Sequence, residues 1–182
     1  MNKEIETKVL NIDKSEITNK LTTLGATKVL ETKLTVDWFR PTEVTDDNDP
    51  WYLRIRTTSD GKSEITWKSK PEFIGISKQV TEINIPTNDP ESMADLFKAI
   101  GLVIYGHQEK YRTSWKYEDW RFDLDEYPNI PAYLEIEGHD EQHLQQAITL
   151  LGLEQNKSVA EGERTLIQKE YGQNWHDMRF TE

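Results

Sequence analysis

The sequence predicts an α+β fold in which a closed antiparallel β-barrel with a charged interior is covered on its outside by helices. Nearly every predicted strand has one apolar and one charged face. The charges repeat at i and i+2, whereas solvent-exposed sheet faces normally mix Thr, Ser, Gln and Lys. Like charges this close repel unless opposite charges lie between them, as they can across a barrel interior. The alternative is a sandwich whose charged faces point to water.

Eight alternating segments form the predicted strands. They are residues 3–10, 33–39, 51–57, 64–70, 76–85, 103–117, 120–127 and 132–138. In the first strand, Glu4, Glu6 and Lys8 share one face, and Ile5 and Val9 share the other. A charged interior is costly, because filling it with apolar side chains would stabilise a barrel more. We therefore interpret the interior as a binding site for a ligand that is anionic and metal-bound.

Capping residues and glycines delimit four predicted helices. They begin at Asp13, Asp89, Asp140 and Ser158 and end near Gly25, Gly101, Gly152 and Gly172. Amphipathic spacing in these segments predicts that the helices cover the apolar outer face of the barrel. The acidic, turn-rich segment 41–50 is predicted to be a mobile loop at the rim.

The last predicted helix carries many charged residues. The charged residues of the last helix are interpreted as a solvated face or a lid; they are Glu161, Glu163, Arg164, Lys169 and Glu170. Two histidines, His139 and His143, are interpreted as surface residues. The six tryptophans are expected to pack in the core. We expect a single domain over residues 1–182, with a core at about 1–152 and a helical extension at 153–182.

Composition narrows the class of protein. A formal net charge of −11 argues against a general nucleic-acid-binding protein, so an anionic partner must meet a local basic cluster. The chain has no cysteine, which favours a cytoplasmic location and excludes thiolate metal sites. No long apolar run is present, so neither a membrane span nor a signal peptide is expected.

Several charged motifs follow one another along the predicted strands. They are E-I-E-T-K (4–8), L-R-I-R (53–56), W-K (67–68), E-K-Y-R (109–112), F-D-L-D (122–125) and Y-L-E-I-E-G (133–138). The first is similar to the Glu-x-Glu-x-Lys signature of the CYTH superfamily, the triphosphate tunnel metalloenzymes, and the later ones follow in the order that this family shows. The first motif alone would be weak evidence for the family, but the whole series covers residues 4 to about 152. The resemblance implies an eight-stranded antiparallel β-tunnel that binds a linear triphosphate.

The resemblance also implies roles for individual residues. Basic side chains would hold the phosphate oxygens; they are Lys8, Arg54, Arg56, Lys68, Lys78, Lys110 and Arg112. Carboxylates would bind Mg²⁺ or Mn²⁺; they are Glu4, Glu6, Asp123, Glu135 and Glu137, with Glu82 and Asp125 as supporting acids. Glu6 and Lys8 are the candidate catalytic residues, and Glu6 would accept the proton of the attacking group.

One strand departs from the pattern of many relatives. Where they have Arg-x-Glu-x-Glu, this chain keeps Glu82 but has Val80 and Asn84 at the flanking positions. Lys78, two residues earlier on the same face, is the candidate replacement for the missing cation. The departure leaves the identity of the substrate open.

Three functions remain open from the sequence. The favoured one is a metal-dependent triphosphatase acting on inorganic tripolyphosphate or on a nucleoside or thiamine triphosphate. The second is a class IV adenylate cyclase that makes cyclic AMP and pyrophosphate from ATP, and the third is a non-catalytic polyphosphate- or nucleotide-binding module. The expected partner is a small triphosphate, with no nucleic acid and no membrane, and the protein is expected to be a monomer or a homodimer.

Overall fold

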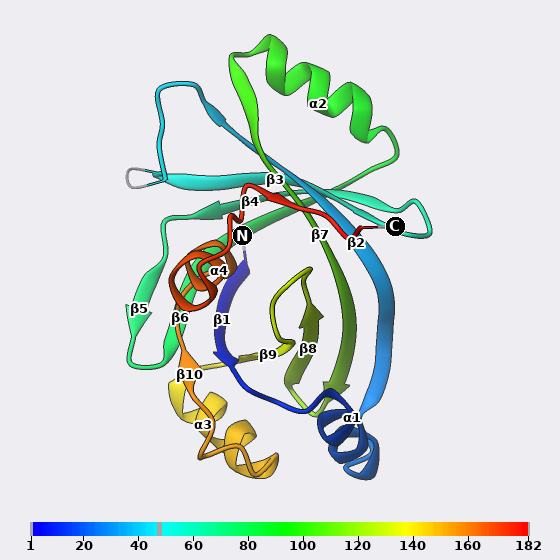
Figure 1. Ribbon diagram of the computed structural model, residues 1–182, viewed down its shortest axis with the longest axis vertical. Coiled ribbons are helices and arrows are strands. Elements are labelled where there is room, and N and C mark those ends of the chain that lie inside the picture. Colours follow the sequence, from blue (N-terminus) through cyan, green and yellow to red (C-terminus); the bar gives the residue numbers. More distant parts are fainter. Residues whose placement is uncertain (1, 47–48, 182) are drawn as a thin grey trace.

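The computed structural model describes residues 2–46 and 49–181, and its centre is a closed barrel of eight antiparallel strands (Figure 1). Around the barrel the strands are β1 (Asn2–Val9), β9 (Tyr133–Gly138), β8 (Trp120–Glu126), β7 (Leu102–Tyr117), β2 (Thr27–Pro41), β3 (Trp51–Thr58), β4 (Ser63–Ser69) and β6 (Ser77–Thr87). The pairing of β1 with β6 closes the ring. The predicted barrel is therefore confirmed.

The helices are α1 (Lys14–Thr23), α2 (Pro90–Ala99), α3 (Glu141–Leu150) and α4 (Glu163–Tyr171). The first three begin where the sequence predicts, because Asp13, Asp89 and Asp140 each accept a hydrogen bond from the backbone N–H three residues later. No helix in the described part of the chain is long and apolar enough to cross a membrane. The rim segment 41–50 forms turns, and residues 47–48 of it lie outside the described part.

The predicted capping box at Ser158 is wrong. Ser158–Val159 forms a short strand, β10, that pairs with Lys8 and Val9 of β1. The reason is that β6 pairs with β1 only from Asn2 to Glu6, so the rest of that β1 edge is open to another strand. The helix begins five residues later, at Glu163, after Gly162.

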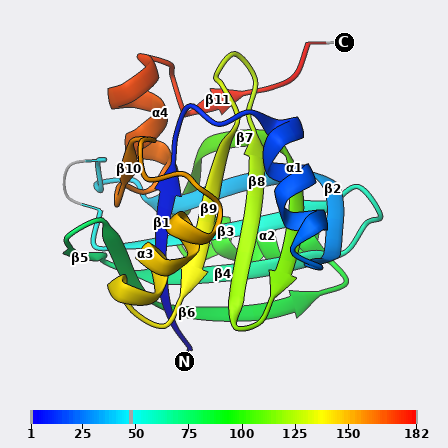
Figure 2. The same ribbon diagram turned by 90° about the horizontal axis from the view of Figure 1, so that it is seen from below.

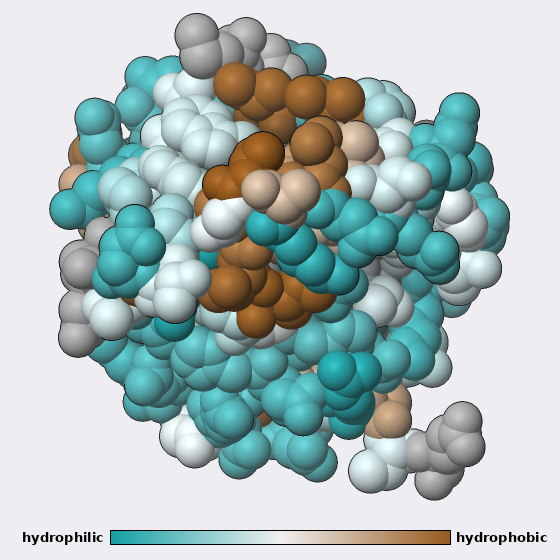
Figure 3. Space-filling model, turned by 90° about the horizontal axis from the view of Figure 1, so that it is seen from above, coloured by the Kyte–Doolittle hydropathy of each residue, from teal (hydrophilic) through white to brown (hydrophobic). Residues whose placement is uncertain are grey.

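Two apolar layers cover the barrel from outside, as the alternating strands predict. α1 and α3 lie over β1, β8 and β9 (Figure 2), and Ile17, Leu144 and Phe122 are buried between them. On the other side α2 packs Phe97 against Phe39 of β2, with ring centroids 5.1 Å apart. Apolar groups remain exposed on the face that carries α2 (Figure 3), where Leu96 and Ile100 lie in α2.

A third apolar cluster joins the C-terminal segment to the inner face of the barrel. Val36 pairs with Arg56 and therefore points inward like it. Val36 and Leu34 are fully buried against Leu166 and Ile167 of α4. Part of the interior is thus filled with apolar side chains, and only the rest is left for charges.

Two further short strands extend the sheet. β11 (Asp177–Met178) pairs in parallel with β7, and β5 (Glu72–Ile74) pairs with β6.

Candidate functional site

The charged part of the interior encloses a cavity of about 310 Å³. Nine basic and eight acidic side chains line it, in a chain whose net charge is −11. The predicted site residues that line it are Glu4, Glu6, Lys8, Arg54, Arg56, Lys68, Lys78, Glu82, Arg112, Asp123, Glu135 and Glu137. The structure therefore brings together residues from seven strands of the barrel.

Strand register explains how these side chains meet. Residues opposite each other in neighbouring strands share a face, so a pairing places both side chains in the interior. Glu6 lies opposite Lys78 on one side and opposite Glu137 on the other. Glu135 lies opposite both Lys8 and Asp123. The apolar partners of these residues face the covering helices.

Among the described residues, five arginines line the cavity, and the guanidinium groups of Arg54, Arg56 and Arg112 lie near enough to repel one another. Arg54 is 8% exposed, and its nearest acid, Glu163, is 3.5 Å away. The Nε atom of Arg54 has no hydrogen-bond partner among the described residues. Burial, with Arg54 and Arg112 nearby, lowers the pKa of Arg56 although Glu64 lies 2.8 Å from it. Buried cations with unfilled donors and mutual repulsion favour a bound anion here.

Two lysines hold Glu6 on the acidic side. Its Oε1 atom lies 2.6 Å from Lys8 Nζ and 2.5 Å from Lys78 Nζ. Burial and Glu135 favour the neutral acid, but Lys78 and Lys8 outweigh them and lower the pKa of Glu6 to about 2. Lys8 also pairs with Glu135 at 3.0 Å. Glu6 is consequently ionised at neutral pH.

Two other carboxylates are incompletely compensated. Burial raises the pKa of Glu4 to about 7, although Lys68 contacts it. Lys68 is shared, since it also lies 2.6 Å from Glu82. Burial likewise raises the pKa of Glu137, and Arg121 opposes this only in part. An added cation near these carboxylates would restore the balance of charge.

The donor chemistry of the cavity fits a hard divalent cation. Glu4, Glu6, Glu135 and Glu137 offer carboxylate oxygens, which Mg²⁺ and Mn²⁺ prefer. No group of three or more His, Asp or Glu side chains within residues 2–46 and 49–181 is already arranged around one metal position. The lysines on Glu6 and Glu135 would have to release part of their contacts for a cation to bind.

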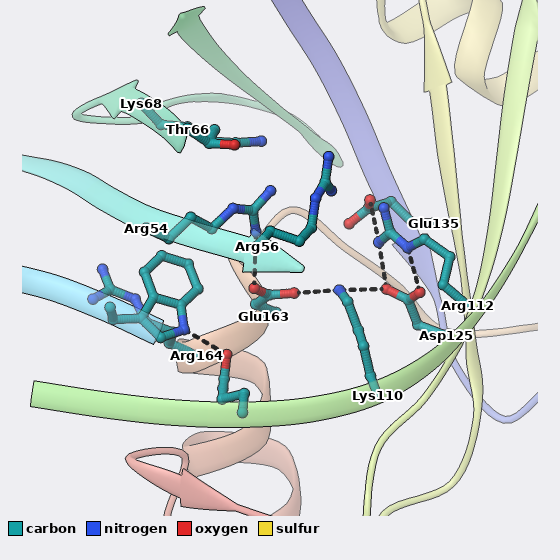
Figure 4. A network of polar contacts seen from close by, with 12 residues as sticks. Arg54, Arg56, Thr66, Lys68, Lys110, Arg112, Asp125, Glu135, Glu163 and Arg164 are labelled. Atoms are coloured by element: carbon teal, nitrogen blue, oxygen red, sulfur yellow. Dashed lines mark hydrogen bonds and ion pairs between the residues drawn. The ribbon is translucent and has the colours of Figure 1, made fainter. Parts of the chain in front are cut away.

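Lys110 and Asp125 do not line the cavity. Lys110 is 1% exposed and lies between Asp125, at 2.9 Å, and Glu163, at 2.8 Å (Figure 4). Asp125 also accepts hydrogen bonds from Nε and Nη2 of Arg112, at 2.6 and 2.5 Å. Both predicted residues therefore support Arg112 and Glu163 from behind rather than facing the cavity.

Sequence reasoning missed Glu163 and Arg164, and the prediction that they lie on a solvated face is wrong. Glu163 accepts hydrogen bonds from Lys110 and from Tyr127 Oη at 2.6 Å, and the surrounding cations hold its pKa well below the usual range against the effect of burial. Arg164 lies over the ring of Tyr52, 3.9 Å from its centroid, and 3.0 Å from Asp49. Glu163 and Arg164 are two adjacent charges at the start of a helix, so no alternating pattern in the sequence indicated that they contact the barrel interior.

We expect Glu163→Gln to destabilise the protein by about 1–3 kcal/mol. The amide would leave Lys110 with Asp125 as its remaining acid and would remove the partner of Arg54. Urea unfolding measures the change, with Glu161→Gln as the control two residues earlier. An unchanged midpoint would show that the buried contacts of Glu163 contribute nothing to stability.

Acid should destabilise the fold through the same network. The pKa values of Glu6 and Glu82 fall from 4.5 to about 2 on folding, so the unfolded chain binds more protons between these values. Their stabilisation is then complete above about pH 5 and is lost as the pH falls towards 2. Thermal midpoints at pH 7, 4 and 2.5 test this, and a constant midpoint would contradict it.

Comparisons with known proteins agree on one family. A family model described as the CYTH domain matches residues 2–170. A protein of Methanocaldococcus jannaschii named "Putative adenylate cyclase" is 32% identical over 139 residues, which cover 74% of this chain and 75% of the relative.

Solved structures share the fold. A protein from Pyrococcus horikoshii superposes with a TM-score of 0.71 at 25% identity, over 85% of this chain and 94% of the other. A Hippeastrum protein, described as a "Putative adenylyl cyclase" with a dominant triphosphatase activity, gives a TM-score of 0.63 at 17% identity. The match covers 93% of this chain and 96% of the Hippeastrum chain, and it supports the fold alone.

Proposed function

Because the chain belongs to the CYTH family, we propose that it is a divalent-metal-dependent hydrolase of triphosphate-containing substrates, which it binds inside the barrel. Members of the family are adenylate cyclases or triphosphatases and bind triphosphates. The observation that carries the proposal is the pairing, in one cavity, of three guanidinium groups with incompletely compensated carboxylates. The substrates considered are inorganic tripolyphosphate, nucleoside triphosphates and thiamine triphosphate.

The basic residues bind and orient the substrate in this mechanism. Arg54, Arg56 and Arg112 offer planar donors that match pairs of phosphate oxygens. Lys68 of the neighbouring strand β4 and Lys78 of β6 add ammonium groups. Strand pairing fixes these positions, so the basic groups would bind the phosphate chain in one orientation.

The acidic residues hold the metal and receive the proton. Glu6, Asp123, Glu135 and Glu137 would hold a Mg²⁺ or Mn²⁺ ion, which would neutralise the charge that develops on the phosphoryl group. Glu6 is a poor proton acceptor, because its pKa is about 2. Glu4, with a pKa of about 7, is better matched to accept a proton from water near neutral pH, and we assign it that role.

Adenylate cyclase activity is the second candidate, because the relative from Methanocaldococcus jannaschii carries that name. The two activities differ in the attacking oxygen, which is water in one and the 3′-hydroxyl of ATP in the other. Hydrolysis is favoured because it requires only the phosphate and metal contacts. Chromatography of the products from ATP decides: orthophosphate supports the hydrolase, whereas cyclic AMP with pyrophosphate supports the cyclase.

A further inference from the structure

We propose that the substrate carries an aromatic ring system, and that this ring stacks on Phe73 at the mouth of the cavity. The inference rests on the proposed function and extends it from the triphosphate to the organic part of the substrate. Phe73 lies in β5, and its side chain lines the cavity although it is 57% exposed. Among the 24 lining residues, most are charged, so a free apolar ring there is an exception.

The register of β5 aims Phe73 towards the interior. Phe73 lies opposite Lys78, whose ammonium group contacts Glu6 inside the barrel. Paired residues share a face, so Phe73 points to the same side as Lys78. Pro71, two residues earlier, also lines the cavity. Together Phe73 and Pro71 form an apolar lip next to the residues that we assign to the phosphates.

Phe73 offers a free ring, unlike the other aromatic residues of the cavity. The ring of Trp38 lies 5.4 Å from the guanidinium of Arg54 and 5.1 Å from that of Arg164, and Trp38 is 4% exposed. Tyr52 is covered by Arg164. Within the described part of the chain, no ring stacking or cation contact engages Phe73. An incoming aromatic ring would therefore find its stacking surface on Phe73.

The turn that follows Phe73 contacts helix α3. The backbone N–H of Ile76 donates a hydrogen bond to Glu141 Oε1 at 3.2 Å. Gly75 has φ +54°, and a Cβ at this position would lie 1.9 Å from the same carboxylate oxygen. The hydrogen bond from Ile76 ties the β5–β6 turn to α3, and only glycine fits beside the Glu141 carboxylate at position 75.

Steady-state kinetics with three substrates test the proposal: tripolyphosphate, ATP and thiamine triphosphate, each with Mg²⁺ or Mn²⁺. We expect Phe73→Ala to lower kcat/KM for ATP or for thiamine triphosphate about tenfold relative to tripolyphosphate. Which of the two loses activity identifies the ring as a purine or as that of thiamine. Phe73→Trp should preserve the preference, and binding of the β,γ-imido analogue of ATP gives a readout independent of turnover.

The outcomes separate this inference from the proposed function. Equal losses on all three substrates, or no loss on any, would overturn it. The control is His139→Ala, which removes an exposed ring outside this cavity. If His139→Ala showed the same selective loss of kcat/KM as Phe73→Ala, the inference would also be overturned. Turnover of tripolyphosphate alone would overturn the inference and leave the proposed function standing. Failure to bind or cleave any of the three would instead overturn the proposed function itself.

Discussion

Replacement of Glu6 by Gln is expected to lower kcat/KM for triphosphate substrates at least about 100-fold. Glu6 is fully ionised between Lys8 and Lys78, and we place it among the ligands of the metal. An amide keeps the shape of the side chain but removes the charge that a divalent cation requires. Steady-state kinetics at saturating Mg²⁺ or Mn²⁺ measure the loss.

The controls for this variant separate catalysis from folding. Loss of the Glu6 charge also leaves Lys78 without its closest acid, so circular dichroism must show that the variant is folded at the assay temperature. Glu137→Gln is a second test, because Glu137 is not held between two lysines. Glu126→Gln, on the partly exposed pair with Lys14, should retain full activity. Wild-type kinetics in both Glu6→Gln and Glu137→Gln would refute the assignment of the metal ligands.

Replacement of Arg112 by Ala is expected to lower the free energy of unfolding by about 3–5 kcal/mol. Arg112 is 7% exposed and contacts Asp123 at 2.5 Å, Asp125 at 2.5 Å and Glu135 at 3.2 Å. Its removal leaves three buried carboxylates without their shared cation. Urea unfolding at pH 7 measures the change.

A second variant at this position separates geometry from charge, and a surface variant serves as the control. Arg112→Lys keeps the charge but not the two parallel hydrogen bonds to Asp125, so it should recover only part of the stability. Arg179→Ala removes an exposed arginine paired with Asp177 and should change stability by less than about 0.5 kcal/mol. If Arg112→Ala unfolded at the same urea concentration as the wild type, the buried network would not stabilise the fold.

The barrel was predictable because charged and apolar side chains alternate regularly along its strands. Each strand places one side chain in the interior and the next against a helix, so the face that carries Glu4 and Glu6 could be read along β1 and repeated on the other strands. The helix starts were predictable for a similar local reason, since Asp13, Asp89 and Asp140 cap their own helices. These features depend on neighbours in sequence.

Features that depend on distant contacts were not predictable. The pattern at Ser158 matched a capping box, but the open edge of β1 determined that this segment forms a strand. Glu163 enters the interior only because α4 packs on Leu34 and Val36 of β2. Lys110 has the same inward direction as Arg112, yet Glu163 lies over its ammonium group, which no strand pattern reveals. Phe73 lies on a three-residue strand, too short for a periodic signal.

Turnover of tripolyphosphate with Mg²⁺ or Mn²⁺, compared with the same reaction in excess chelator, tests the central claim most directly. The account predicts release of orthophosphate that stops when the chelator is added and resumes when the metal is restored, because carboxylates and guanidinium groups share one cavity. Cleavage that continues at the same rate in chelator would contradict the role of the metal. Absence of both cleavage and binding would contradict the assignment of the barrel interior as a triphosphate site.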